Sequence, residues 1–200
     1  MDEIMAISRH RMGTDGNGIT TLVAFYGCHL NCRYCINRQC KRENTSRVYI
    51  SPEELIDILK IDDIYFRMTK GGVTFGGGEP LLASNYIREF CWEADSNWQI
   101  NVETSLNVNW DNIDWLTPRV DRWYIDIKDA NPEIYKAYTG IDNQLVFDNL
   151  KRLSKEAGKE KIVIRVPRIE GFNTEEDIEK SIAAVEQYAD NIERFDYIVC

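Results

Sequence analysis

The sequence has little of several features that would point to other kinds of protein. Zinc modules usually contain a second C-x2-C pair or a distant pair of histidines. The 200 residues contain no second C-x2-C pair, and the two histidines, His10 and His29, do not form a zinc-binding pair with the usual spacing. No apolar run approaches the roughly 20 residues of a membrane span. The amino terminus lacks the basic-then-apolar pattern of a signal peptide. Six cysteines without such a signal predict reduced thiols and a cytoplasmic protein.

Charge and length set further limits. The formal net charge is -9, which makes a nucleic-acid backbone a poor partner. Internal repeats, low-complexity tracts and linkers are missing. The chain therefore predicts a single domain, 1–200, that is large enough to bury a core. Residues 1–18 show no clear period, so we expect an irregular segment there.

Three cysteines stand at C-x3-C-x2-C spacing directly after an apolar run. Cys28, Cys32 and Cys35 follow Leu22–Tyr26, which predicts a short buried strand, and Gly27 allows a sharp turn out of it. Thiolates at this spacing can wrap one side of an iron–sulfur cluster, which normally takes four protein thiolates. Three ligands from one loop would leave one iron open to a small molecule. The spacing therefore favours chemistry over electron storage.

Two other interpretations of these cysteines stay open from spacing alone. A structural zinc ion would need His29 or Cys40 as its fourth ligand, and His29 lies only one residue from Cys28. Buried, inert thiols are the other interpretation, although three so close together on a turn are unusual for them. Cys40, Cys91 and Cys200 look incidental, and Cys91 fits the apolar pattern of a helix, so we expect it to be buried.

Strand-like apolar runs alternate with helical stretches along the chain. Two helices have clear starts, because Ser51-Pro52-Glu53-Glu54 and Asn131-Pro132 each combine a capping residue with an early proline. We expect strands at 20–26, 72–75, 99–103, 123–128, 161–166 and 195–199, and helices from 51, at 84–94, 110–116, from 131, at 146–156 and at 174–188. This alternation predicts parallel strands with right-handed crossovers. The expected fold is a single α/β domain, a partial (β/α)6 barrel, with a doubly wound sheet as the alternative.

Residues that are costly to bury gather at the predicted carboxyl ends of the strands. Both candidate architectures place functional residues at those ends. Five successive strands carry such residues, which favours one shared site: Cys28 to Cys35, Gly77-Gly78-Glu79, Glu103, Asp126 with Lys128, and Arg165. Bare glycine backbone allows a ligand to approach closely, although a turn needs glycine for its geometry alone. The charged residues are, taken singly, equally compatible with a structural ion-pair network.

The cysteine motif, with an aromatic residue before its last cysteine, resembles the signature of radical S-adenosylmethionine enzymes. More narrowly, residues from about 15 to 173 resemble the glycyl-radical-enzyme activating enzymes, the group of pyruvate formate-lyase activating enzyme. The segments that carry this resemblance are 15–21 (Asp-Gly-Asn-Gly-Ile-Thr-Thr), 72–79 (Gly-Val-Thr-Phe-Gly-Gly-Gly-Glu), 124–128 (Tyr-Ile-Asp-Ile-Lys), 138–140 (Tyr-Thr-Gly), 149–153 (Asn-Leu-Lys-Arg-Leu) and 165–167 (Arg-Val-Pro). The cysteine motif is specific for the superfamily, and the Asp-x-Lys strand is specific for the activating enzymes.

The resemblance implies the cofactors and the site residues. Cys28, Cys32 and Cys35 would hold a [4Fe–4S] cluster, whose open iron would bind the amino and carboxylate groups of S-adenosylmethionine. The other candidates match positions around that cofactor: Gly77, Gly78 and Glu79 at its amino group; Glu103 near the ribose or a monovalent cation; Asp126, Lys128 and Arg165 at the methionine end; Tyr34 and Ile36 along the adenine. Tyr34 is equally compatible with a place in the core.

The implied activity is reductive cleavage of S-adenosylmethionine to a 5'-deoxyadenosyl radical, which takes a hydrogen from a glycine of a partner glycyl radical enzyme. A flavodoxin or ferredoxin-type protein is the implied electron donor. Cys40 alone cannot supply the ferredoxin-like insertion of many such enzymes, so we expect one cluster. Asn17 and Thr21 replace the family's common proline and arginine. The alternatives are a radical enzyme for a small molecule or ribosomal peptide, and a non-catalytic zinc-binding module.

Overall fold

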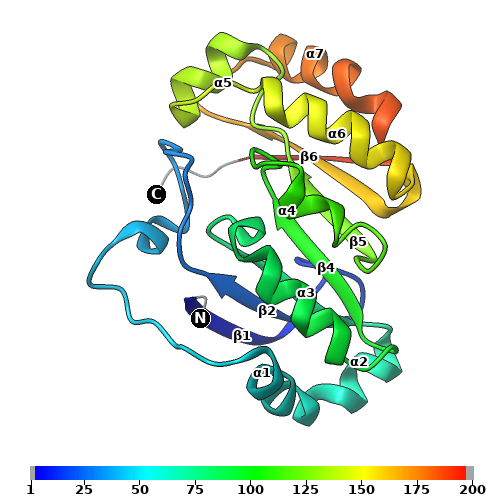
Figure 1. Cartoon of the computed structure of the whole chain (residues 1–200). Helices are drawn as coiled ribbons and strands as arrows, with labels where there is room; N and C mark the ends of the chain where they lie inside the picture. Colours follow the sequence, from blue (N-terminus) through cyan, green and yellow to red (C-terminus); the bar gives the residue numbers. More distant parts are fainter. Residues whose placement is uncertain (1–2, 197–200) are drawn as a thin grey trace. The chain divides into compact units, whose positions relative to one another are not determined.

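The structure is a computed structural model that describes residues 3–196 (Figure 1). The chain forms two compact units, each built from separate stretches of sequence. The first unit comprises Met1–Cys28, Asn37–Glu103 and Asp111–Arg122, and the second comprises His29–Ile36, Thr104–Trp110 and Trp123–Cys200. Within the described residues, no helix is long and apolar enough to cross a membrane.

The first unit is built on a four-stranded stretch of sheet in chain order. Its strands are β1 (Ile4–Met12), β2 (Ile19–Phe25), β3 (Gly72–Gly77) and β4 (Gln99–Thr104). β2, β3 and β4 are parallel, with Leu22, Thr74 and Asn101 side by side, whereas β1 runs antiparallel to β2. The carboxyl ends of three parallel strands therefore lie at one edge of this unit.

Helices of the first unit bury the aromatic core against this sheet. Phe75 lies between Phe25 and Phe90, with ring centroids 5.9 and 5.1 Å apart. The predicted start at Ser51 is confirmed, because the Ser51 hydroxyl accepts a hydrogen bond from the Glu54 amide and the Glu54 carboxylate accepts one from the Ser51 amide. The helical segments are η1 (Arg38–Lys41), α1 (Pro52–Leu59), η2 (Lys60–Asp62), α2 (Asp63–Thr69), η3 (Pro80–Ala83), α3 (Ser84–Glu93) and α4 (Asp111–Asp114).

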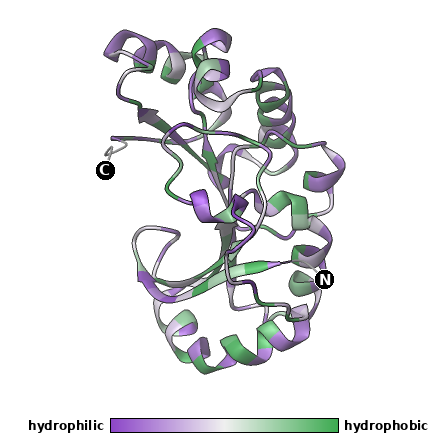
Figure 2. Ribbon diagram, turned by 90° about the vertical axis from the view of Figure 1, so that its left-hand side faces the viewer, coloured by the Kyte–Doolittle hydropathy of each residue, from purple (hydrophilic) through white to green (hydrophobic). Residues whose placement is uncertain are grey.

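The second unit has three parallel strands and its own helices. The strands are β5 (Arg122–Asp126), β6 (Ile162–Arg168) and β7 (Asn191–Asp196). The helical segments are α5 (Pro132–Thr139), α6 (Gln144–Glu156), η4 (Lys159–Lys161), α7 (Glu175–Val185) and η5 (Glu186–Tyr188). Helices of both units carry hydrophobic and hydrophilic residues along their length, as amphipathic helices do (Figure 2). The predicted cap at Asn131 is confirmed, since its side chain accepts from the Glu133 amide.

The expected irregular segment at 1–18 is wrong, because residues 4–12 form β1. Most side chains of β1 are exposed or half-buried, so the strand shows no apolar period, and pairing with β2 decides its conformation. The sequence also did not predict α2 as a separate helix. The expected last strand, 195–199, begins earlier, at Asn191, and its residues from 197 onward lie outside the described part of the chain.

A buried carboxylate fastens β1 to the helices of the first unit. Asp62 is fully buried, and Arg9 donates to both of its oxygens at 2.7 and 2.5 Å. His10 Nε2 lies 2.9 Å from the same carboxylate, and the Thr21 hydroxyl donates to it at 3.4 Å. The hydrogen bonds from Arg9 hold the pKa of Asp62 below its usual value.

Replacing Asp62 with asparagine is expected to destabilise the fold by about 2 kcal/mol at neutral pH, because Arg9 loses a charged acceptor at a buried site. The lowered pKa means that the ionised carboxylate stabilises the fold above its unfolded pKa of about 3.9, and that this contribution disappears as the pH falls through the folded value. Urea unfolding of wild type and Asp62→Asn, at pH 7 and below pH 3, measures the difference in their free energies of unfolding at each pH. A gap in unfolding free energy that does not shrink in acid would contradict the assignment.

Candidate functional site

The stem of the cysteine loop lies at the carboxyl end of β2, in the first unit. The Gly27 amide donates to the Cys40 carbonyl at 2.9 Å, and the Gly27 carbonyl accepts from the Glu79 amide at 2.8 Å. The Gly78 amide donates to the Phe25 carbonyl at 2.9 Å. The backbone before Cys28 is therefore fixed on both sides, by the turn that follows the loop and by the segment after β3.

The glycines at the end of β3 and directly after it are required by close contact with β2 and with Gly27. A Cβ atom on Gly78 would lie 2.0 Å from the Gly27 carbonyl oxygen, and one on Gly77 would lie 2.8 Å from Cα of Ala24. Gly77 also has a φ of 94°, which favours glycine. The sequence offered ligand approach or turn geometry as reasons for these glycines. The positive φ of Gly77 fits turn geometry, and the structure adds a further reason at Gly78, whose backbone lies against Gly27 and supports the cysteine loop. Approach of a ligand to these glycines stays a prediction.

Two carboxylates accompany this edge of the first unit. Glu79 is buried, and its side chain accepts a hydrogen bond from the Leu81 amide at 3.3 Å, so it caps η3. Glu103 is half-buried near the end of β4, and its Oε2 lies 3.0 Å from the position of a Cβ on Gly76. The first unit thus brings Cys28, Gly77, Gly78, Glu79 and Glu103 to the carboxyl ends of its three parallel strands.

The rest of the cysteine loop is anchored within the second unit. The Asn31 amide donates to the Thr139 carbonyl at 2.7 Å, and the Arg33 amide donates to the Tyr138 carbonyl at 3.1 Å. The Tyr34 ring packs against Tyr138 and Phe172, with centroids 6.2 and 5.8 Å apart. The ring of Tyr34 therefore holds the loop in place.

Ile36, the other residue that we matched to the adenine, is 77% exposed. An apolar side chain so open to solvent is available to a ligand or partner, and it adds nothing to the core of its unit. Its position one residue after Cys35 keeps it at the end of the cysteine loop.

Charged residues at the strand ends of the second unit form a compact group. Lys128 is buried and donates to the Asp126 carboxylate at 2.7 Å. Asp126 pairs in register with Arg165 of the neighbouring strand. The Arg165 guanidinium lies 4.6 Å from the Tyr124 ring centroid, and its Nε lies 3.6 Å from a carboxylate oxygen of Glu193. The expected charged triad is thus assembled within one unit.

The sequence did not single out Asp129, which is buried directly after Lys128. Its carboxylate accepts from the Asn131 amide at 2.8 Å and from the Asn173 side chain at 3.2 Å, and its carbonyl accepts from Asn143. Burial raises the pKa of Asp129. These contacts hold the segment that carries Lys128. The Asp-x-Asn-Pro spacing was the available signal, since an aspartate often bonds the amide two residues on.

The cysteines divide into two chemical groups. Cys28, Cys32 and Cys35 are half-buried free thiols, whereas Cys40 and Cys91 are buried. Burial raises the pKa of Cys91 to about 12, which confirms the expectation of an inert thiol in α3. Within residues 3–196, no group of three or more cysteine, histidine or acidic side chains converges as a metal site. The fit to an iron–sulfur cluster therefore depends on the donor chemistry of three accessible thiols on an anchored backbone.

Alkylation of the reduced, metal-free protein is expected to distinguish these groups. Iodoacetamide at about pH 8 should modify Cys28, Cys32 and Cys35 and spare Cys40 and Cys91, because burial shields the last two from the reagent and also raises the pKa of Cys91 to about 12. Peptide mass spectrometry reads each site, and urea-unfolded protein shows that all can react. Equal rates of alkylation of Cys91 and Cys32 in the folded protein would contradict the burial of Cys91.

Comparison with known proteins identifies the family. Residues 22–185 match the Radical SAM superfamily, and the chain belongs to it. This confirms the predicted family and enzyme class, and with them an α/β fold of the partial-barrel type. The family implies a [4Fe–4S] cluster and S-adenosylmethionine as cofactors.

Several relatives are named as activating enzymes. The chain is 32% identical over 149 residues to the 4-hydroxyphenylacetate decarboxylase activating enzyme of Clostridioides difficile, covering 74% of this chain and 45% of the relative. It is 36% identical over 125 residues to the (2S)-3-sulfopropanediol dehydratase activating enzyme of Klebsiella oxytoca, covering 62% and 39%. A domain of pyruvate-formate lyase-activating enzyme from Bacteroides vulgatus has a similar structure, with a TM-score of 0.54, 26% identity and coverage of 62% and 78%. The chain spans less than half the length of the first two relatives.

Proposed function

We propose that this chain is the radical-generating part of a glycyl-radical-enzyme activating enzyme. The observation that carries the proposal is the cysteine motif on an anchored loop in a chain whose curated relatives are activating enzymes of glycyl radical enzymes. Cys28, Cys32 and Cys35 would be the protein ligands of the cluster. The chemistry that such a cluster would supply is one electron for reductive cleavage of a carbon–sulfur bond of S-adenosylmethionine, and the radical so formed would take hydrogen from a glycine of the partner.

The chain's own residues would bind and orient the cofactor. In the second unit, Lys128 and Arg165 offer positive charge to its carboxylate, and Asp126 offers negative charge to a cationic group. In the first unit, Glu103 and the backbone at Gly77 to Glu79 would serve the amino group and ribose. The proposed chemistry needs no histidine as an acid or base, because the cofactor carries the difficult step and the protein supplies position and exclusion of water.

Anaerobic reconstitution tests the proposal. Iron and sulfide are expected near four each per chain, dithionite should drive cleavage of S-adenosylmethionine, and a glycyl radical enzyme from the same genome should acquire a radical detectable by electron paramagnetic resonance. Cofactor cleavage without any glycyl radical, across all such partners, would point to a small-molecule or peptide substrate. One zinc per chain and no cleavage would overturn the radical chemistry itself.

Lys128→Met is expected to weaken binding of S-adenosylmethionine about tenfold, because it removes a buried charge near the carboxylate. Lys151→Met, at an exposed position on α6, is the matched control and should bind normally. Isothermal titration of the reconstituted proteins measures both dissociation constants. Equal affinity of Lys128→Met and wild type would remove Lys128 from the cofactor site.

A further inference from the structure

A short turn directly after the cysteine loop concentrates positive charge in an acidic protein. Arg38, Lys41 and Arg42 are all exposed at η1 and its carboxyl end, while the chain as a whole carries a net charge of -9. We propose that this basic turn, defined as Arg38, Lys41 and Arg42, is the docking site of a small acidic electron-carrier protein. The inference rests on the proposed function, because it names the route by which the reducing electron arrives.

The basic turn is fixed to the backbone that precedes the first cluster cysteine. The Cys40 carbonyl accepts from the Gly27 amide at 2.9 Å, and the Cys40 side chain is buried beneath the turn. The Asn37 side chain donates to the Gly77 carbonyl at 2.7 Å. A protein held by the basic turn would therefore arrive beside Cys28, and the docking surface cannot move independently of that cysteine.

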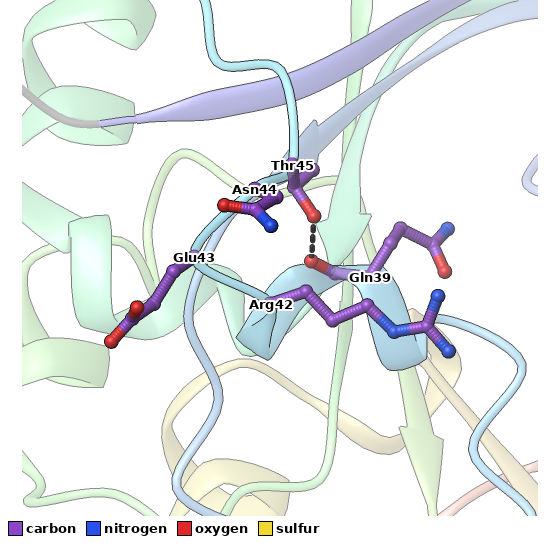
Figure 3. Close-up of a pocket in the computed structure, with 5 residues that line it drawn as sticks. All are labelled: Gln39, Arg42, Glu43, Asn44 and Thr45. Carbon is purple, nitrogen blue, oxygen red and sulfur yellow. Dashed lines mark hydrogen bonds between the residues drawn. The ribbon is translucent and has the colours of Figure 1, made fainter.

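The loop after the turn keeps its positive face open. The Thr45 hydroxyl donates to the Gln39 carbonyl at 2.6 Å, and the Arg42 amide donates to the same carbonyl at 3.1 Å. Figure 3 shows the Glu43 side chain pointing to the opposite side from that of Arg42, so this adjacent carboxylate does not cover the guanidinium. These residues line a hollow of about 580 Å³ at the surface.

Arg47, the next cation along the chain, is engaged in the fold and is not part of the docking surface. It donates to the Glu3 carboxylate at 2.8 Å, and its guanidinium lies 3.8 Å from the Tyr26 ring centroid. Arg47 is half-buried, whereas the three residues of the basic turn are exposed.

Charge complementarity selects the kind of partner. Electron-transfer encounters use small, weak interfaces, and opposite charges steer the partners and set their orientation. An acidic carrier would be attracted by the basic turn, which would bring it close to the backbone that precedes Cys28. In the step itself the carrier is oxidised by one electron and the cluster is reduced by one, with no bond formed or broken.

Binding of a carrier to the metal-free protein tests the inference without relying on turnover. The probes are purified oxidised flavodoxin and an oxidised [2Fe–2S] ferredoxin, both acidic. Arg38→Gln, Lys41→Gln and Arg42→Gln, combined in one variant, should raise the dissociation constant of at least one carrier about tenfold at low salt. The matched control combines Lys151→Gln, Lys155→Gln and Lys159→Gln, which removes the same charge from exposed positions of the second unit and should bind like wild type.

Wild-type affinity should fall with ionic strength until it equals that of the basic-turn variant. The docking site would be refuted if the two triple variants bound the carriers with equal affinity. It would also be refuted if the wild-type dissociation constants for both carriers did not change with salt. Loss of binding to a glycyl radical enzyme in the basic-turn variant, with carrier binding intact, would assign the turn to the other partner and also overturn it. Cleavage of S-adenosylmethionine driven by dithionite should be the same in both variants, and its failure in wild type would refute the proposed function separately.

Discussion

Cys32→Ala is expected to abolish assembly of the cluster and with it all cleavage of S-adenosylmethionine. Within residues 3–196 the two cysteines outside the motif, Cys40 and Cys91, are buried and therefore cannot readily replace Cys32. Iron and sulfide should fall from about four per chain to background, and activity should fall by at least about a thousandfold. Metal analysis, visible absorption and product chromatography measure the loss.

The folded state should survive this substitution, because Cys32 is half-buried and the loop is held by backbone hydrogen bonds on either side. Circular dichroism and urea unfolding of the metal-free variant should match wild type closely. Cys91→Ala is the matched control, and it should keep its cluster while losing about 1 kcal/mol of stability through a small cavity. Full cluster occupancy in Cys32→Ala would remove Cys32 from the ligand set.

Gly78→Val is expected to impair both the binding of the cluster and the binding of S-adenosylmethionine. Any side chain at position 78 meets the Gly27 carbonyl at 2.0 Å, so the stem of the cysteine loop must shift. We expect a loss of stability of about 3 kcal/mol and poor retention of the cluster, with weaker binding of S-adenosylmethionine as a result. The sequence alone suggests a narrower effect, on the cofactor and not on the cluster.

The control for Gly78→Val is Gly13→Ala, where nothing lies within 4 Å of the added Cβ and the φ of 71° is the source of strain. It should cost about 1 kcal/mol and leave cluster content unchanged. Iron content after gel filtration, together with unfolding free energies, separates the two variants. If the Gly78→Val protein were stable and held a full complement of iron, the close contact between position 78 and the Gly27 carbonyl would be contradicted.

Local chemistry explains why most of the fold could be predicted. The starts of α1 and α5 were visible because a capping side chain and a proline act within a few residues. β1 was not visible, because its conformation depends on pairing with β2 more than on its own pattern. Local sequence signals therefore sufficed to predict elements whose conformation depends on their own residues. They failed for β1, whose conformation depends on a neighbouring strand.

The candidate site shows the same division. The spacing of Cys28, Cys32 and Cys35 identified the ligand loop directly. The role of Gly78 was hidden, because only the fold shows that the Gly27 carbonyl occupies the space beside it. The partner of Tyr34, Phe172, is distant in sequence, so the ring cluster that anchors the loop had no local signal either.

The outer border of β1 is irregular, and this bears on whether a strand of another molecule can add to it. An unpaired strand border can add a strand from another molecule and so start aggregation. Here the register shifts between Ile4 and Ala6 and between Ser8 and Arg11, and His10 adopts a φ of 57°. The irregular pairing with β2 and the backbone bridge between Ile4 and Val48 make the border a poor template for a foreign strand. The strand that ties down the first unit thus also offers little regular backbone to another molecule.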